Sequence, residues 1–442
     1  MAEIRAFRGV RYNLEKVGDG GRLVSPPYDV IDAKLQQELY DANPSNIVRV
    51  IQGKVDPADG GENAVYVRAR DSYRGWLEEG VLEADDTPSI YVYTQTFDIH
   101  TPEGVKRKSR QGIVALVEIQ RLGEGGIYPH EHTMPGPKKD RLELMRHTEA
   151  AFGQIFSLFS DPDFHARSLL EPHVQSSPLF AFDDSDGVNH AFWRISDENT
   201  VNRVCSFLST RELFIADGHH RYETAVNHRD ERLGDGGEEG AGYCYRMQTL
   251  VNMDDAEGMA INPIHRVVTN VSSDDLARLK SGLGKLFETK EIPYTDVDAI
   301  GREIASRAEP ARPCYGALLG DADTVTLLKL RADVDVAALD KESHSEAWRM
   351  LDSGLLQLVL SKILDLGTES LIKGEKVRFI KMEAEVRQAV RDSSQNVGFY
   401  LNPVGMKQLR DVVLAGERMP PKSTFFYPKV FTGLVIQDFN LS

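Results

Sequence analysis

A short stretch of this 442-residue chain brings together side chains that could bind an anion or move a proton. It combines one acid, one glycine, two histidines and one arginine, which are Asp217, Gly218, His219, His220 and Arg221. The apolar residues 213–216 before it are typical of a buried strand, and residues 222–233 suit a helix that Gly234 would end. The pattern therefore places the five residues in the turn between a strand and a helix.

A turn of this kind can hold a phosphate group. The first N–H groups of a helix have no partner, and the helix dipole is positive at that end. Gly218 can adopt a positive φ, which lets a ligand approach the backbone, and Arg221 can bind two phosphate oxygens at once. His219 and His220 can donate hydrogen bonds or carry protons near neutral pH. The alternative interpretation is that Asp217 caps the helix and the histidines are only partly exposed polar residues.

A second stretch, "YPHEHTMPGPKKDR", places His130, Glu131 and His132 in a proline-stiffened loop, with Lys138 and Arg141 soon after. Stiff loops suit the precise positioning of polar groups. We interpret Glu131 as a general base, with His130 beside it, and Lys138 and Arg141 as groups that stabilise negative charge. The alternative is a solvated loop followed by the charged face of a helix, which explains the lysines easily but the His-Glu-His run between prolines less well.

A metal site could be assembled from both stretches. Neighbouring residues of one chain rarely converge on one ion, and the spacing is not the i, i+4 pair of a helical zinc site. We therefore expect no metal held by the protein alone, and Mg²⁺ only as the companion of a phosphate substrate. The ligands weighed are Asp217, His219, His220, His130, Glu131 and His132.

Two further stretches offer possible substrate contacts. In "VSPPYDVI", Tyr28 and Asp29 follow a Pro-Pro pair, where a rigid turn and a ligand-facing loop are equally good interpretations. In "GERMPPKSTFFYPK", Lys422 and Ser423 resemble a polar binding tip. The glycine loop of a Walker A motif is missing there, and the adjoining aromatic residues favour packing.

The remaining chain predicts helices mixed with antiparallel hairpins, which indicates an α+β fold. Helices are expected in "DAKLQQELYDANPSN" and "NAVYVRARDSYRGWLEEGVL", and "NIVRVIQG" between them is expected to be a strand. The composition changes near residue 270, so we expect a domain at 1–270 and a C-terminal α/β domain at 271–442 whose tail packs back on the first. Hairpins are expected at residues 89–120, 178–195 and 312–330.

The composition limits the classes of function. The net charge of −16 disfavours nucleic acid, and the basic run "VKRKSR" suits a solvated hairpin. Three distant cysteines, with no CxxC spacing, fit a reducing cytoplasm. We expect no signal peptide and no membrane span.

The stretches "PPYDVI", "YPHEHTMPGPKKDR", "ADGHHRYETA", "LNP" and "GERMPPKSTFFYPKVFTGLVI" together resemble the family of domain of unknown function 1015 (DUF1015). The "ADGHHRY" turn is also similar to the phosphate-binding turn of the ParB and sulfiredoxin superfamily, which includes the free serine kinases. This resemblance implies a ParB/sulfiredoxin-like core within residues 1–270, with nucleotide phosphates at residues 217–221. Sulfiredoxins carry a reactive cysteine in this turn, and this chain has none there, so sulfinic acid reduction is not expected.

The resemblance implies a phosphoryl-transfer enzyme of small-molecule metabolism, similar to the free serine kinases. ATP, ADP or pyrophosphate would be the donor, and a hydroxyl compound such as serine the acceptor. Two alternatives stay open: a phosphatase acting on a small phosphomonoester such as phosphoserine, and a nucleotide-binding regulatory protein without catalysis. The expected partner is a small phosphate-containing ligand, and the sequence leaves a homo-oligomer open.

Overall fold

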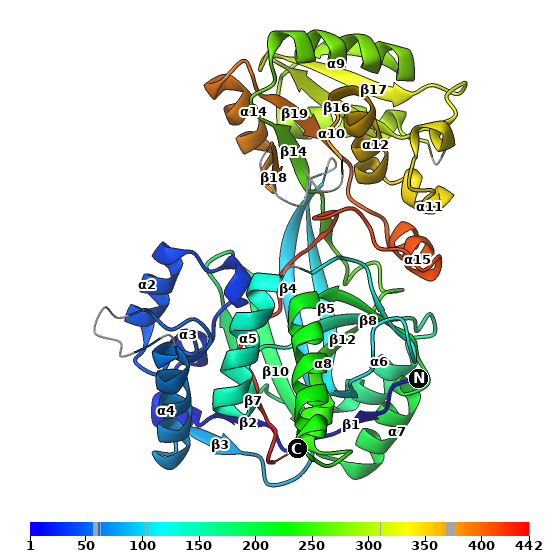
Figure 1. The fold of residues 1–442 in the computed structure, drawn as a ribbon. Helices are drawn as coiled ribbons and strands as arrows, with labels where there is room; N and C mark the ends of the chain where they lie inside the picture. Colours follow the sequence, from blue (N-terminus) through cyan, green and yellow to red (C-terminus); the bar gives the residue numbers. More distant parts are fainter. Residues whose placement is uncertain are drawn as a thin grey trace.

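The computed structural model describes residues 1–55, 61, 63–101, 104–133, 135–309, 311–367 and 376–441. Within these ranges the chain forms two large β-sheets with helices on both faces of each. Figure 1 shows them as a lower and an upper body, with both termini on the lower one. The predicted α+β class is confirmed.

The first sheet is mixed and has nine strands. The pairs β6–β11 and β8–β12 are parallel, and all other pairs are antiparallel. Its strands, in spatial order, are β6 (Ile127–Pro129), β11 (Leu213–Asp217), β8 (Ile155–Phe159), β12 (Tyr245–Asn252), β5 (Gly104–Glu118), β4 (Ile90–Thr101), β10 (Asn189–Ile195) and β9 (Phe180–Asp183), and β1 (Ile4–Arg5) pairs with β5.

Alternating side chains bury both faces of this sheet. On β5, Ile113 and Ala115 belong to one buried apolar cluster, while Val114 and Leu116 belong to another. Because side chains alternate along a strand, the two clusters lie on opposite faces. The first cluster contains residues of α6 (His165–Leu170) and α7 (Glu198–Leu208), and the second contains residues of α5 (Pro135–Thr148) and α8 (His219–Gly234).

The second sheet has six strands, and every pair in it is antiparallel. Helices α9 and α12 pack on one face, and α10 and α14 on the other. The strands are, in order, β15 (Phe287–Pro293), β17 (Thr324–Leu330), β16 (Cys314–Leu319), β19 (Val397–Tyr400), β14 (His265–Val268) and β18 (Val377–Ile380). The helices are α9 (Ser273–Leu286), α10 (Val297–Arg307), α12 (Asp352–Leu364) and α14 (Glu383–Asp392).

The C-terminal segment returns from the second sheet to the first body. After α15 (Met406–Leu414), β20 (Phe425–Phe426) pairs with β13 (Ile261–Asn262). Near the end of the chain, β21 (Gln437–Asp438) pairs with β7 (Ala150–Ala151). This course carries residues 418–432 past the end of β11. The second sheet begins with β14 at His265, a few residues before the predicted division near residue 270. That division stays a proposal.

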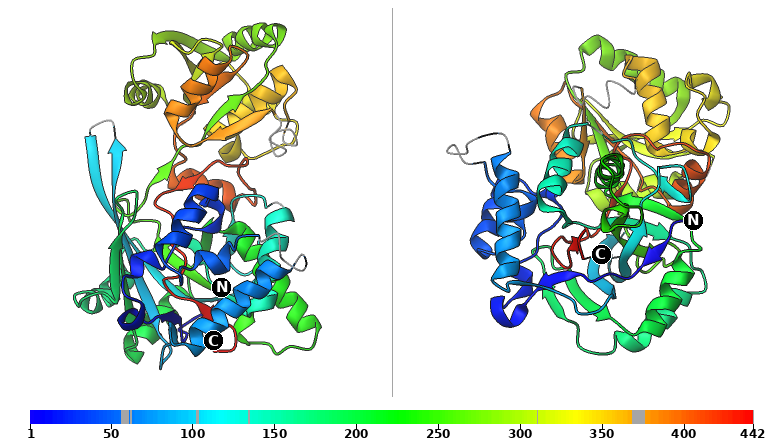
Figure 2. Two further views of the ribbon diagram at one scale, coloured as in Figure 1. Left: turned by 90° about the vertical axis from the view of Figure 1, so that its left-hand side faces the viewer. Right: turned by 60° about the horizontal axis from the view of Figure 1, so that its bottom comes forward.

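The three predicted hairpins are confirmed as β4–β5, β9–β10 and β16–β17. Residues 102–103 of the first turn lie outside the described ranges. Figure 2 shows the long β4–β5 hairpin extending beyond the rest of its sheet. The predicted helices are confirmed as α2 (Ala33–Ala42) and α4 (Ala64–Glu78). The smaller elements are α1 (Leu14–Val17), β2 (Val10–Tyr12), β3 (Leu82–Ala84), α11 (Glu346–Arg349) and the 3₁₀ helices η1 (Gly20–Arg22), η2 (Tyr28–Val30), η3 (Glu171–His173), η4 (Gly242–Cys244) and η5 (Val336–Leu339).

The strand predicted for "NIVRVIQG" is wrong, because residues Val48–Ile51 form the short helix α3. The side-chain oxygen of Asn46 accepts a hydrogen bond from the backbone N–H of Val48 at 2.9 Å, which begins the helical turn. Ile47, Val48, Val50 and Ile51 are all buried. A short apolar run buried on several sides shows no clear period, so the sequence alone does not separate helix from strand.

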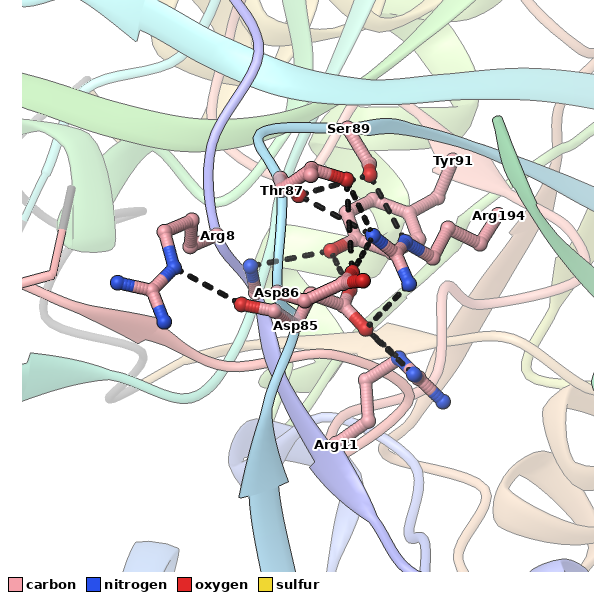
Figure 3. Close-up of polar contacts among 9 residues, drawn as sticks. Arg8, Arg11, Asp85, Asp86, Thr87, Ser89, Tyr91 and Arg194 are labelled. Carbon is pink, nitrogen blue, oxygen red and sulfur yellow. Dashed lines mark hydrogen bonds and ion pairs between the residues drawn. The ribbon is translucent and has the colours of Figure 1, made fainter. Parts of the chain in front are cut away.

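A buried carboxylate, Asp85, joins three strands of the first body (Figure 3). Its side chain is fully buried and forms ion pairs with Arg11 of β2 and Arg194 of β10. The hydroxyl of Tyr91 on β4 donates a hydrogen bond to the same carboxylate and accepts one from the backbone N–H of Gly9 at 3.0 Å. The N-terminal segment is therefore attached to the sheet through a charge that water does not reach.

We expect Asp85→Asn to lower the free energy of unfolding by about 3 kcal/mol, because it leaves two arginines beside a neutral group in a buried site. Asp86→Asn is the matched control, since Asp86 also pairs with Arg194 but its side chain is 79% exposed. Urea denaturation should show a clear loss for Asp85→Asn and a midpoint near wild type for Asp86→Asn. Equal midpoints for the two variants would contradict a stabilising role for Asp85.

Candidate active site

The predicted turn between strand and helix exists, and it is sharper than expected. Strand β11 ends at Asp217, and α8 begins at His219, directly after Gly218. Gly218 has a φ of +95°, and a Cβ built there would lie 3.1 Å from the guanidinium of Arg221. Other residues adopt this conformation only with strain, so glycine is required here. The first turn of α8 therefore contains both histidines and the arginine.

Asp217 does not cap α8, so that alternative is wrong. Its carboxylate accepts from Nη2 of Arg221 at 2.7 Å and from Nζ of Lys429 at 2.6 Å. Burial by itself would raise the pKa of Asp217, but Lys429 and Arg221 outweigh burial and hold that pKa well below its usual range. One negative charge thus holds two positive charges beside a helix N-terminus, which leaves an excess of positive charge.

His130 and His219 form a neutral, hydrogen-bonded pair beside Asp217. Nδ1 of His130 lies 2.6 Å from the carbonyl oxygen of Ile215, so this nitrogen carries the proton. The backbone N–H of His130 donates to Nε2 of His219 at 3.2 Å, so that nitrogen accepts. Burial lowers the pKa of both histidines, and in His219 the neighbouring His130 lowers it further. These bonds fix the orientation of both rings.

Glu131 lies next to this pair. One ligand atom each from His130, Glu131 and His219 lies within 4.8 Å of the others, the one such cluster among the described residues. Nε2 of His130 contacts the hydroxyl of Thr424 at 2.9 Å, and its Nδ1 donates to the carbonyl of Ile215. The two histidines are therefore engaged in hydrogen bonds within the protein, and Glu131 accepts one from the backbone N–H of Lys422 at 3.4 Å.

Lysines from the second half of the chain converge on the same place. Nζ of Lys422 lies 3.6 Å from Glu131. Lys381 and Lys429 place their Nζ atoms 4.5 and 4.7 Å from the centre of the Phe425 ring. Burial lowers the pKa of Lys381, and the charge of Lys429 lowers it further. Four cations, counting Arg221, thus surround the acidic pair of Asp217 and Glu131.

The structure distributes the other predicted residues around this centre. His220 is half-buried, and burial lowers its pKa while Glu131 opposes that effect. Lys138 pairs with Glu223 on α8 at 2.9 Å, which joins α5 to α8. His132 lies 3.5 Å from Arg418. Asp29 is exposed, and its charge acts on His220 and Lys381.

Three predicted residues, Arg141, Tyr28 and Ser423, make contacts with groups other than Glu131. Arg141 packs its guanidinium 4.2 Å from the Tyr28 ring and donates to the carbonyl of Ile51 at 2.7 Å. Ser423 is buried, and its hydroxyl donates to the carbonyl of Pro420 at 2.6 Å, so the structure does not bring it to the site.

Sequence reasoning missed Lys381 and Lys429. Lys429 ends the quoted C-terminal stretch and Lys381 follows β18, but neither lies in a pattern that separates it from an ordinary surface lysine. Their common location arises from the return of the tail to the first body, which local spacing does not encode.

Within the described ranges, none of the helices combines the length and the apolar character that a bilayer crossing requires.

Comparison with known proteins identifies the family. The model of a family described as proteins of unknown function, DUF1015, matches residues 4–353, and the chain belongs to this family. The matched residues contain the "DGHHR" turn and Glu131, while Lys381, Lys422 and Lys429 follow them. A search of curated proteins finds no match.

The search of solved structures matches a free serine kinase mutant in complex with ADP. It is 15% identical over 68% of this chain and 84% of the kinase, with a TM-score of 0.33. A conserved hypothetical protein from Pyrococcus furiosus is 14% identical over 72% of this chain and 94% of its own, with a TM-score of 0.33. C-terminally truncated SbnI from Staphylococcus aureus is 14% identical over 72% and 84%, with a TM-score of 0.34. These scores do not define the activity of the present chain.

The neutral histidine pair makes stability depend on pH. The pKa of His219 is lowered in the folded protein and is about 6.5 when unfolded, so the unfolded chain binds more protons below that pH. The free energy of unfolding should therefore fall as pH drops from about 6.5, by about 1.4 kcal/mol per pH unit for each such histidine. His219→Gln should show a shallower slope than wild type in urea denaturation between pH 7 and about 5.

His165→Gln is the control for this slope, because His165 is exposed on α6. It should retain the wild-type dependence on pH. Parallel slopes for His219→Gln and wild type would show that His219 is not held neutral.

Proposed function

We propose that this protein transfers a phosphoryl group from ATP, ADP or pyrophosphate to the hydroxyl group of a small molecule. The observation that carries the proposal is the excess of positive charge at the N-terminus of α8. There, Arg221 and Lys429 share the single carboxylate of Asp217, and Lys422 and Lys381 add further charge. Positioning and charge neutralisation are most of what phosphoryl transfer demands of a protein.

The phosphate groups would bind at Gly218 and the first turn of α8. Gly218 lets a phosphate approach the N–H groups at the start of the helix. Arg221 is fixed for this task, since it donates to the Asp217 carboxylate and to the carbonyl of Gln154. Lys429 and Lys381, which face the same Phe425 ring, would neutralise the charge of the donor.

Glu131 would accept the proton of the attacking hydroxyl. Two other carboxylates of this region are occupied: Asp217 holds two cations, and Glu223 contacts Thr133, Lys138 and Arg418. Glu131 has looser contacts, with the backbone N–H of Lys422 at 3.4 Å and its Nζ at 3.6 Å, and its side chain is 22% exposed. His220 is half-buried beside it and would contact the substrate.

A magnesium ion fits this arrangement through oxygen ligands. The phosphates and water would supply these ligands, and Glu131 would stay available to accept the proton. When bound, the ion would neutralise charge on the phosphates. The histidines would stay in their hydrogen bonds and keep Glu131 and the turn in place.

A ³¹P NMR screen of the purified protein tests the proposal. ATP, ADP and pyrophosphate should each be incubated with serine and related hydroxyl compounds, and phosphoserine should be incubated alone. A new phosphomonoester signal is expected with at least one pair of donor and acceptor. Phosphate release from phosphoserine alone would indicate a phosphatase, and nucleotide binding without any product would indicate a regulatory protein.

Glu131→Gln should lower kcat by about 100-fold or more, because it removes the proton acceptor, while the KM for the donor changes little. Glu212→Gln is the matched control, since Glu212 lies before the opposite end of β11 and binds the hydroxyl of Tyr128 at 3.0 Å. Wild-type turnover is expected for this control. Unchanged kcat in Glu131→Gln would remove Glu131 from the mechanism.

A further inference from the structure

A small cavity lies beside Arg221, and Glu131, His130 and His219 do not line it. Its volume is about 40 Å³, room for about three water molecules. Three arginines reach it from different elements: Arg141 from α5, Arg221 from α8 and Arg246 from β12. The rest of its wall is largely apolar, including Ile51, Leu144, Met145 and Phe152.

Arg246 is buried with most of its hydrogen-bonding capacity unused. The residue is 4% exposed, and its Nη2 donates to the carbonyl of Gly153 at 2.7 Å. Its Nε and Nη1 atoms have no hydrogen-bond partner. A buried donor without a partner costs about 1–3 kcal/mol, and more when the group is charged. Such a group indicates that an acceptor belongs to the site.

Two other buried arginines show how this chain otherwise treats a guanidinium. Arg266 donates to backbone carbonyls of residues 264, 265, 421 and 422. Arg110 donates to the side-chain oxygen of Gln95 and to the carbonyls of Pro428 and Tyr427. Both lack a carboxylate, as Arg246 does, but carbonyl oxygens surround them. Arg49 and Arg211 each leave only Nε without a partner, so among the described residues Arg246 is the arginine with the largest deficit.

The charge around the cavity is also unbalanced. Burial lowers the pKa of Arg246 to about 9, and the positive charge of Arg221 lowers it further. Asp217 compensates Arg221, but Arg246 has no ion-pair partner among the described residues. The side-chain nitrogen of Gln154, next to Gly153, has no acceptor either. The region has donors and positive charge in excess, and an anion would satisfy both.

We propose that this cavity binds the carboxylate group of a small, partly apolar molecule. The carboxylate would accept hydrogen bonds from Arg246 and lie against Arg221, a planar pairing that guanidinium groups favour. The carbon chain of the molecule would contact Leu144 and Met145. A planar carboxylate matches the fork of a guanidinium, and its carbon chain suits the apolar walls, whereas inorganic phosphate has no apolar part. This cavity is distinct from the proposed phosphate-binding position at Gly218, although Arg221 takes part in both.

Isothermal titration calorimetry with simple anions tests the inference without any nucleotide. Acetate, butyrate and inorganic phosphate should be titrated into the full-length protein at constant ionic strength in chloride. Butyrate is expected to bind roughly tenfold more tightly than acetate, because its two additional methylene groups contact apolar walls. Phosphate is expected to have no binding that depends on Arg246.

Arg246→Gln should weaken butyrate binding at least tenfold, because it removes the charged donors. Arg246→Lys keeps the charge but loses the planar pair of guanidinium donors, so it should also weaken binding. This variant replaces Arg246→Gln in the test if that variant does not fold. Arg167→Gln is the control, since that side chain is 59% exposed on α6. Glu131→Gln should bind butyrate as wild type does, so failure of the proposed phosphoryl transfer would not be confused with failure here.

Three results would overturn the proposal. The first is wild-type protein that binds neither carboxylate. The second is butyrate affinity that is unchanged in the folded Arg246 variants, which would show that butyrate binds elsewhere or without specificity. The third is phosphate binding that is lost with Arg246, which would assign the cavity to phosphate instead.

Discussion

The pairing of Asp217 with both Arg221 and Lys429 is the interaction on which the proposed site depends. It joins a residue at the end of β11, one in the first turn of α8 and one in the C-terminal tail. Without this carboxylate, a buried arginine and a partly buried lysine would repel each other beside a positive helix end. With it, they stay in place and retain a net positive charge. The same pairing therefore connects the two halves of the chain and prepares a place for an anion.

The C-terminal tail completes this site. Strand pairs β13–β20 and β7–β21 hold the tail against the first body, and between them it presents Lys429 to Asp217. The backbone N–H of Met419 donates to the carbonyl of His130 at 2.9 Å, so the tail also supports the loop that carries Glu131. Residues separated by about half of the chain thus act as one unit, and the site and the fold stabilise each other.

Local patterns in the sequence predicted the turn at residues 217–221, the hairpins and the loop at His130, because each depends on neighbours in the chain. The helix at Val48–Ile51 was missed, since burial on several sides hides its period. Lys381 and Lys429 were missed for a different reason: they reach the site only because the folded C-terminal tail returns to the first body, and local sequence patterns do not show this. Asp217 was weighed as a helix cap, and only the structure shows its cationic partners.

The affinity for pyrophosphate, measured by calorimetry in wild type and in Lys429→Met, tests the central claim most directly. If the excess positive charge around Asp217 binds the anion, wild type should bind pyrophosphate. Lys429→Met should bind it roughly tenfold more weakly or worse. The difference should shrink as salt concentration rises, because screening weakens interactions between charges. Equal affinities for the two proteins at low salt would contradict an anion-binding site that depends on the pairing of Asp217 with Lys429.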